Sequence, residues 1–229
     1  MLRYLFILMS VVSLLSCSNS EIGNSKDVNP ESVYFDYKVW GDEDDSSITV
    51  RLQYRFGGPN GTTLLLEDPS KAELDGMLVP VDSSRFLGAY YEVMKPVQAF
   101  EGKHSILFTD LNKKEYKEEF DFPVIFLKKE LPAVVKRNDL TLEIGGLKPG
   151  GKLRILFTDT SFYSRGIEKL DTIPDGTVLI TKADLNDLKN GPIHLEIIRE
   201  EDKWLGKSTK EGGKLSLSYG LKREFVLED

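Results

Sequence analysis

The strict alternation of apolar and polar residues is the feature that most constrains the fold of this chain. In residues 47–56, SITVRLQYRF, every second side chain is apolar, from Ile48 to Phe56. Successive side chains of a strand point to opposite faces, so this pattern predicts a strand with one buried and one solvated face. Residues 33–40 alternate in the same way, and we expect them to form a partner strand across the connection GDEDDSS.

The rest of the chain consists of short alternating segments separated by turn residues. Such segments, recurring every 8 to 12 residues or so, are typical of a β-sandwich. Asp75-Gly76 lies between two short apolar runs and predicts a hairpin. Residues 127–132, LKKELP, interrupt the pattern with charge and proline. We therefore predict an all-β fold of two tandem β-sandwich domains, at residues 33–127 and 133–229.

One segment favours a helix, of two turns at most. Thr181 is a suitable N-terminal cap, Asp184 suits the first turn, and Asn190-Gly191 suits a left-handed C-terminal stop.

The segment GKHSILFTD at residues 102–110 recurs as GKLRILFTD at residues 151–159. A recent duplication would place both copies at the same position in each domain. The first copy instead precedes the final strand of the first domain, whereas the second lies near the start of the second domain. We expect two strands with the same local needs: a turn glycine, a buried Ile and Phe, and an aspartate that starts the next turn.

The layout resembles the tandem immunoglobulin-like or fibronectin-type-III-like domains that are common in lipoproteins of the Bacteroidota. The resemblance rests on residues 63–76, on Gly88-Ala89-Tyr90 and on residues 188–192, LKNGP. It implies immunoglobulin-like sandwiches of the disulfide-free kind, because the chain has a single cysteine.

The N-terminus has the layout of an export signal, with Arg3 before an apolar run at residues 4–15. That run is shorter than the roughly 20 apolar residues that span a bilayer. Leu14-Leu15-Ser16-Cys17 resembles the lipobox of bacterial lipoproteins, which implies cleavage after residue 16 and acylation of Cys17. The residue after it, Ser18, is not the aspartate of inner-membrane retention, so the resemblance implies an outer-membrane anchor. A plain secretory signal with an unrelated cysteine is the alternative.

Residues 17–32, after the predicted cleavage site, are mostly polar and predict a flexible tether behind the anchor. The formal net charge of −7 argues against nucleic-acid binding. We expect a monomer that reaches the membrane through its lipid and faces either the periplasm or the cell surface.

Motifs for catalysis are missing from the sequence. The two histidines, His104 and His194, lack the spacing of a zinc site, and no nucleophile elbow occurs. We predict no enzyme activity and no cofactor. A hydrolase that uses a carboxylate pair is the alternative from another class, because the chain has 37 acidic residues.

The acidic run at residues 42–45 is the densest group of oxygen ligands. Asp42, Asp44 and Asp45 are candidate calcium ligands, and the other interpretation is a solvated hairpin tip.

Three aromatic residues are candidates for ligand binding: Trp40 on the polar side of its strand, and Tyr163 and Trp204 in expected loops. Such side chains stack on sugars or anchor a protein partner, and they also pack between domains. The function predicted is a lipid-anchored, non-catalytic binding or structural module of the envelope, with a glycan or an envelope protein as partner. A carbohydrate-binding accessory protein of the cell surface is the second interpretation.

Overall fold

The computed structural model of this chain describes residues 21–148, 150–161, 166–173 and 175–229. These residues form a β-sandwich of one large and two small sheets. Eight strands follow one another across the large sheet: β1 (Ile22–Asn24), β4 (Thr62–Leu65), β3 (Ser47–Phe56), β2 (Val33–Asp42), β18 (Gly213–Glu228), β17 (Gly191–Trp204), β14 (Gly151–Asp159) and β15 (Ile167–Ile173). Three more join it: β8 (Gly88–Pro96) beside β3, β7 (Val81–Ser84) beside β8, and β12 (Val134–Lys136) beside β18.

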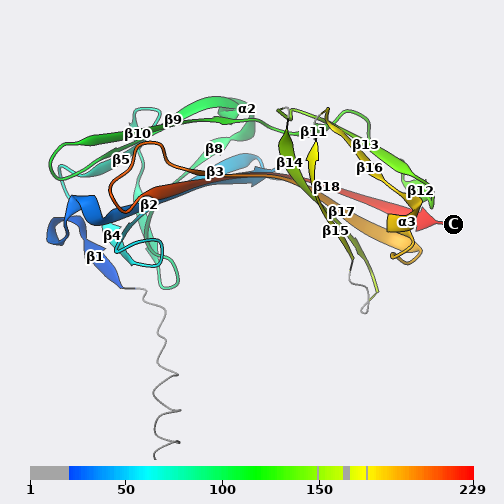
Figure 1. Cartoon of the computed structure of the whole chain (residues 1–229), viewed down its shortest axis with the longest axis horizontal. Helices are drawn as coiled ribbons and strands as arrows, with labels where there is room; N and C mark the ends of the chain where they lie inside the picture. The colour runs from blue at the N-terminus through cyan, green and yellow to red at the C-terminus, as the bar shows by residue number, and fades with distance from the viewer. Residues whose placement is uncertain (1–20, 149, 162–165, 174) are drawn as a thin grey trace, which may run out of the picture.

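The two small sheets lie side by side on the same face of the large sheet (Figure 1). One contains β10 (Glu115–Phe122), β9 (Gly102–Thr109), β5 (Lys71–Leu74) and β6 (Met77–Leu78). The other contains β11 (Phe126–Leu127), β13 (Leu140–Gly145) and β16 (Thr177–Ile180). We call the part of the molecule under the four-stranded sheet the first unit, and the part under the three-stranded sheet the second unit.

The long hairpin of β17 and β18 joins the two units. Residues 213–220 of β18 pair in parallel with β2, and residues 226–228 pair in parallel with β12. On its other side β18 pairs with β17 along the whole of β17, from Gly191 to Trp204. The all-β sandwich class predicted from the sequence is confirmed, and the structure adds that the two units share one continuous sheet. The boundary at residues 128–132 stays a prediction.

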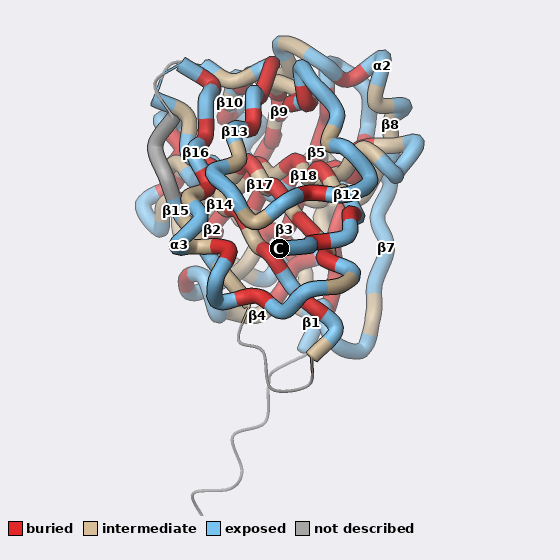
Figure 2. The backbone as a smooth tube through the Cα atoms, turned by 90° about the vertical axis from the view of Figure 1, so that its right-hand side faces the viewer, coloured by how far each residue is buried: buried red, intermediate tan, exposed pale blue. Residues whose placement is uncertain are grey.

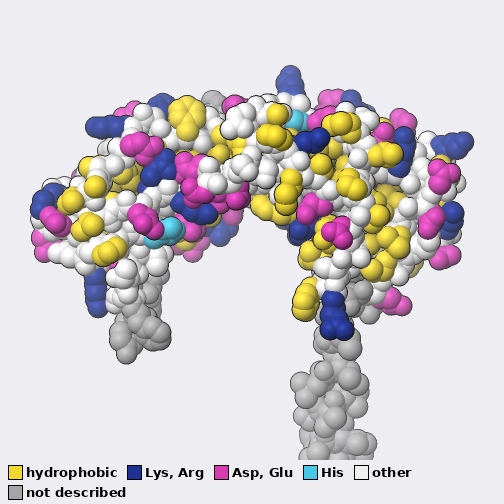
Figure 3. Space-filling model, turned by 180° about the vertical axis from the view of Figure 1, so that it is seen from behind, with side chains coloured by type: hydrophobic (Ala, Val, Ile, Leu, Met, Phe, Trp, Pro, Cys, Tyr) yellow, Lys and Arg dark blue, Asp and Glu magenta, His cyan; other side chains and the backbone are white. Residues whose placement is uncertain are grey.

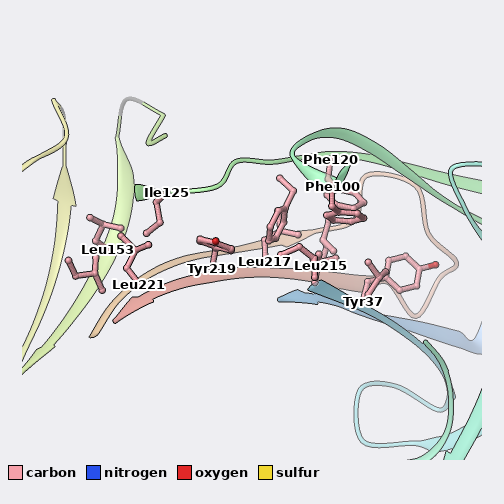
Figure 4. Packing of buried hydrophobic residues seen from close by; sticks show 14 of the residues in the cluster. Tyr37, Phe100, Phe120, Ile125, Leu153, Leu215, Leu217, Tyr219 and Leu221 are labelled. Atoms are coloured by element: carbon pink, nitrogen blue, oxygen red, sulfur yellow. The ribbon is translucent and has the colours of Figure 1, made fainter. Parts of the chain in front are cut away.

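A single apolar core fills the space between the layers (Figures 2 and 4). In the first unit it is aromatic: the Phe108 ring stacks on Tyr54 at 4.5 Å between centroids, and Phe35 meets Phe108 edge-on at 5.0 Å. In the second unit it is mainly aliphatic and includes Leu153 and Ile197, both fully buried, with Phe157 and Phe225 as a T-shaped aromatic pair. Leu215, Leu217, Tyr219 and Leu221 of β18 connect the two parts. Every second residue of β18 therefore supports the core of one unit or the other.

Within the tether predicted for residues 17–32, the described residues 22–32 are structured instead. Residues 22–24 form β1, which pairs in parallel with β4, and two 3₁₀ turns follow, η1 (Ser25–Asp27) and η2 (Pro30–Ser32). The polar residues that suggested disorder make the local hydrogen bonds instead. The side chains of Asn24 and Asn29 cap the two turns, and the Ser25 hydroxyl accepts the amide of Glu67 at 2.9 Å.

Several local predictions are confirmed. The strands at residues 33–40 and 47–56 pair as β2 and β3, and Asp75-Gly76 turns the β5–β6 hairpin with φ of 51° and 79°. Thr181 and Asp184 form a capping box on α3 (Lys182–Leu185), which is one turn long and within the predicted limit of two. The helix ends at Leu185 with Asn186 as its C-cap, so the predicted stop at Asn190-Gly191 is wrong. The sequence pattern missed α2 (Val97–Phe100). Among the described residues, no helix is both long and apolar enough to cross a membrane.

The recurring ILFTD segment serves the same local purpose in two different sheets. Its first copy is in β9 of a small sheet, and its second is in β14 of the large sheet. Both aspartates are buried at the strand end and start a turn: Asp110 accepts the amide of Asn112 at 2.8 Å, and Asp159 accepts that of Ser161 at 2.8 Å. The recurrence therefore reflects strand and turn chemistry.

We expect Leu153→Ala, in the second unit, to destabilise both units together, because they share one sheet and one core. Removing a fully buried leucine side chain costs about 2–5 kcal/mol of unfolding free energy. In a Trp204→Phe background, the fluorescence of Trp40 reports on the first unit. We expect the urea midpoint measured by this fluorescence to fall together with the midpoint measured by far-ultraviolet circular dichroism. Lys38→Ala, an exposed change, is the control. A Trp40 transition that keeps its original midpoint would show that the units unfold independently.

Candidate functional site

We call the face of the large sheet that points away from the small sheets the outer face. Side chains alternate along a strand, and the buried odd-numbered residues of β2 and β18 point to the core, so the even-numbered ones lie on this face. The strand register places Trp40 of β2 beside Ser218 of β18, and Ser218 beside Glu200 of β17. The outer face forms the underside of an arch, and the molecule is hollowed beneath its middle (Figures 1 and 3).

A trough of about 250 Å³ lies on the outer face where the end of β2 meets β18 and β17. It is lined by Trp40, Gly41, Asp42, Asp45, Glu196, Ile198, Ser218, Gly220, Leu221 and Lys222. Trp40 borders it from β2, and Ile198 borders it from β17. Between them β18 places the small residues Ser218 and Gly220 on the outer face. The trough exists because these small residues separate two large apolar ones.

Neighbouring side chains hold Trp40 in place. The Arg51 guanidinium lies over the Trp40 ring at 4.9 Å from its centroid and over the Tyr90 ring at 4.8 Å. Glu92 accepts a hydrogen bond from Arg51 Nε at 2.6 Å, and Tyr90 donates to Asp82 at 3.1 Å. A cation stacked on the face of an aromatic ring stabilises the pair, so the indole is fixed before any ligand arrives.

The acidic loop at residues 42–45 lies at one end of the trough. Asp42 Oδ1 accepts the backbone amides of Asp44 and Asp45, each at 3.0 Å, and Asp42 Oδ2 accepts Lys222 Nζ at 2.6 Å. Partial burial raises the pKa of Asp42, but the hydrogen bond from Lys222 and those from the loop amides outweigh it and hold the pKa below its usual value. Glu43 pairs with Arg223.

The three candidate calcium ligands are not grouped around one point. Among the described residues, no set of three or more acidic, histidine or cysteine side chains is arranged to hold a metal ion. Asp42 and Asp45 line the trough, and Asp44 is exposed. The calcium site stays a prediction.

Trp204 also lies on the outer face, at the end of β17, rather than in the loop predicted for it. Its side chain is 76% exposed. Tyr163 and Cys17 lie outside the described residues.

A second hollow, the junction groove, lies between the layers where the units meet. It has a volume of about 550 Å³ and shares the lining residues Lys148 and Glu201 with a neighbouring hollow of about 480 Å³. Its lining comes from β9, β10, β17 and the loop that holds Lys148. Lys148 contacts Asp121 of β10 at 2.6 Å, and Lys203 of β17 contacts Glu118 of β10 at 2.7 Å. These contacts are ion pairs that link the first unit to β17 and to the second unit.

The inner face of β17 explains why the junction groove is charged. The buried row Ile193, Leu195, Ile197 continues as Arg199, Glu201 and Lys203. Arg199 is buried and contacts Glu201 at 2.5 Å, and its burial lowers the pKa of its guanidinium. Sequence reasoning missed these residues, although the change from apolar to charged side chains within one strand was a visible signal.

The two histidines have structural contacts. His104 lies 2.8 Å from the Asp75 carboxylate and 2.8 Å from the Phe100 carbonyl, and its ring stacks on Phe100. His194 points outward beside Glu196 at 3.2 Å, as the alternation predicts. The strands that carry them, β9 and β17, lie in different sheets.

No protein-family model matches this chain, and no curated protein matches it. Solved structures of three other proteins share a weak similarity. A tetra-tandem repeat in the extending region of a large adhesion protein matches 86% of this chain, which spans half of that structure, at 15% identity and a TM-score of 0.28.

Murine CEACAM1b matches 86% of this chain and 98% of its own, at 12% identity and a TM-score of 0.21. The adhesin InvE of Yersinia pseudotuberculosis matches 88% of this chain and 60% of its own, at 10% identity and a TM-score of 0.22. Similarity this weak does not identify a ligand or a role.

We expect acid to weaken the contact between the units. The hydrogen bond from Lys148 lowers the pKa of Asp121, so the unfolded state binds the proton more readily. The stabilisation is present above the unfolded pKa of about 4 and is lost as the pH falls through the lower folded value. Asp121 is about one-third exposed, so the loss should stay below about 1 kcal/mol.

Urea midpoints of the original protein and of Asp121→Asn, measured at neutral pH and in acid, check this. The substituted protein should be less stable at neutral pH, and the two midpoints should converge in acid. Equal midpoints at neutral pH would contradict a stabilising role for this ion pair.

Proposed function

We propose that this chain is a non-catalytic glycan-binding module held at the outer membrane by a lipid on Cys17. The observation that carries the binding proposal is the trough on the outer face, where a fixed indole borders a hollow lined with polar side chains.

The chemistry of the trough suits a sugar. A sugar ring presents apolar C–H faces, which stack on an aromatic ring, and hydroxyl groups, which need hydrogen-bond partners. Trp40 supplies the ring. Asp42 and Glu196 supply acceptors, and Ser218 and Lys222 supply donors. Because Arg51 already fixes the indole, little side-chain entropy is lost on binding.

The carboxyl groups whose pKa is shifted suit hydrogen bonding to a sugar rather than the role of general acid. The general acid of a glycosidase needs a raised pKa. In the described part of the chain, the carboxyl groups with a perturbed pKa have it lowered, and each pairs with a lysine or arginine. They are Glu31, Asp42, Glu119, Asp121, Glu130, Asp184, Asp202 and Asp229. A carboxylate held ionised can accept hydrogen bonds but cannot donate a proton at neutral pH.

The proposed anchor lies close to the folded part. The lipobox-like Leu14-Leu15-Ser16-Cys17 supports acylation of the chain's single cysteine. Strand β1 begins at Ile22, so four residues separate it from Cys17, and four residues span at most about 14 Å. The lipid would therefore hold the first unit near the membrane surface.

We expect Cys17→Ser to abolish lipidation. In cells fed radiolabelled palmitate, the original protein should be labelled and recovered with the membranes. The Cys17→Ser protein should be unlabelled and should leave the membranes on washing. Absence of label from the original protein would favour the plain secretory signal.

We expect Trp40→Ala to weaken glycan binding by about tenfold or more, because aromatic stacking contributes about 0.5–1.5 kcal/mol beyond the apolar area that is buried. Binding of the purified protein to a glycan array, followed by calorimetry on each glycan that binds, measures this. Ser218→Gln is the second variant, since it fills the floor of the trough and leaves the indole in place.

Phe86→Ala is the matched control, because Phe86 is 92% exposed in the turn between β7 and β8, away from the trough lining. Unchanged affinity in both Trp40→Ala and Ser218→Gln, with both proteins folded, would show that the trough is not the binding site.

A further inference from the structure

Trp40 and Trp204 share the outer face although 164 positions separate them in sequence (204 − 40). Trp40 of β2 lies beside Ser218 on one side of β18. Trp204 of β17 pairs with Lys214 on the other side of β18. They are thus two strand spacings and four residues apart (218 − 214). With strands about 4.8 Å apart and about 3.3 Å per residue, their Cα atoms are roughly 16 Å apart.

A row of small residues leads from the trough toward Trp204. On the outer face β18 carries Gly220, Ser218 and Ser216 in succession. The trough ends beside Trp40 and Ser218, and the face continues over Ser216. At the far end, β14 stops pairing with β17 at Arg199, so Trp204 stands at an open edge of the sheet. A chain-like ligand that leaves the trough toward Trp204 would therefore pass over Ser216 and beside the Lys214–Asp202 ion pair.

The charges along this path favour a neutral chain over an anionic one. Each lysine beside it is held by a carboxylate: Lys38 by Asp36 at 3.8 Å, Lys214 by Asp202 at 2.9 Å, and Lys222 by Asp42 at 2.6 Å. Glu196 and Asp45 in the trough add negative charge. A uronate, sulfate or phosphate group would meet repulsion and would have to displace an existing ion pair. A neutral chain meets acceptors for its hydroxyl groups instead.

We propose that the outer face binds a neutral polysaccharide along β18, with one sugar stacked on Trp40 and a more distant sugar stacked on Trp204. This inference rests on the proposed glycan-binding function and names its ligand class. Trp204 is 76% exposed, so its ring is accessible for a sugar to stack on.

The test uses neutral glucan, mannan, xylan and galactan as probes, with polygalacturonate as the anionic counterpart. Oligosaccharides of increasing length are prepared from the neutral polymer that binds, and affinities are measured by calorimetry for the original protein, Trp40→Ala, Trp204→Ala and Phe86→Ala. We expect affinity to rise once the oligosaccharide is long enough to reach Trp204. In Trp204→Ala that gain should disappear, roughly a tenfold loss for long chains and none for short ones.

The outcomes separate the inference from the proposed function. If Trp40→Ala abolishes binding but Trp204→Ala binds every length as the original protein does, the second stacking position is wrong and the glycan module stands. Preferential binding of polygalacturonate, weakening as salt is added, would overturn the neutral ligand class. Failure of every probe to bind the original protein would overturn both proposals. Trp204→Ala should keep the original urea midpoint, which shows that any loss of affinity is not a loss of folding.

Discussion

The parallel pairing of β18 with β2 is the interaction on which the rest of the structure depends. Residues 213–220 lie along residues 35–42 of β2, and the remainder of β18 continues into the second unit. Backbone N–H and C=O groups must be paired when they are buried, so β2 needs a partner on this side and β18 provides it. One strand therefore holds both units in a single sheet, and its inner face contributes Leu215 to Leu221 to a continuous core.

The inner face of the shared sheet carries charged side chains at the junction, where they form ion pairs. β17 passes from the second unit to the first, and near the junction its inward side chains are Arg199, Glu201 and Lys203. Buried charge is costly unless it is paired and hydrogen-bonded. Arg199 pairs with Glu201 on the same strand, and Lys203 pairs with Glu118 of β10. Beside them, Lys148 of the second unit pairs with Asp121 of β10. The two units therefore meet at the junction groove through polar contacts.

The same pairing builds the outer face that we propose as the binding surface. Trp40 belongs to an N-terminal strand, whereas Ile198 and Trp204 belong to the C-terminal hairpin. They share one surface because β18 lies between β2 and β17 in the sheet. The small outward residues of β18 leave that surface hollow, and the arch makes it concave (Figure 1). Neither end of the chain contains this surface by itself.

The sequence by itself determined the features that depend on neighbouring residues. The period of two specified β2 and β3, Asp75-Gly76 specified a hairpin, and Thr181 with Asp184 specified a helix cap. The aspartates that follow ILF specified two turns. Each of these is a contact within a few residues of the chain, so the local pattern is sufficient to predict it.

Only the tertiary structure decided which strands meet. Residues 22–32 appeared disordered because their composition does not show that β4 offers an open edge and that Asn24 and Asn29 cap their own turns. The alternation of Trp40 placed it on a polar face, but could not place Ser218 and Ile198 beside it. Alternation fixes which face of the sheet a residue occupies. It does not fix which strand lies next to the residue's own strand, since any half-buried strand can pair with any other. The pairing is chosen by the whole core, which no local segment of this sequence contains.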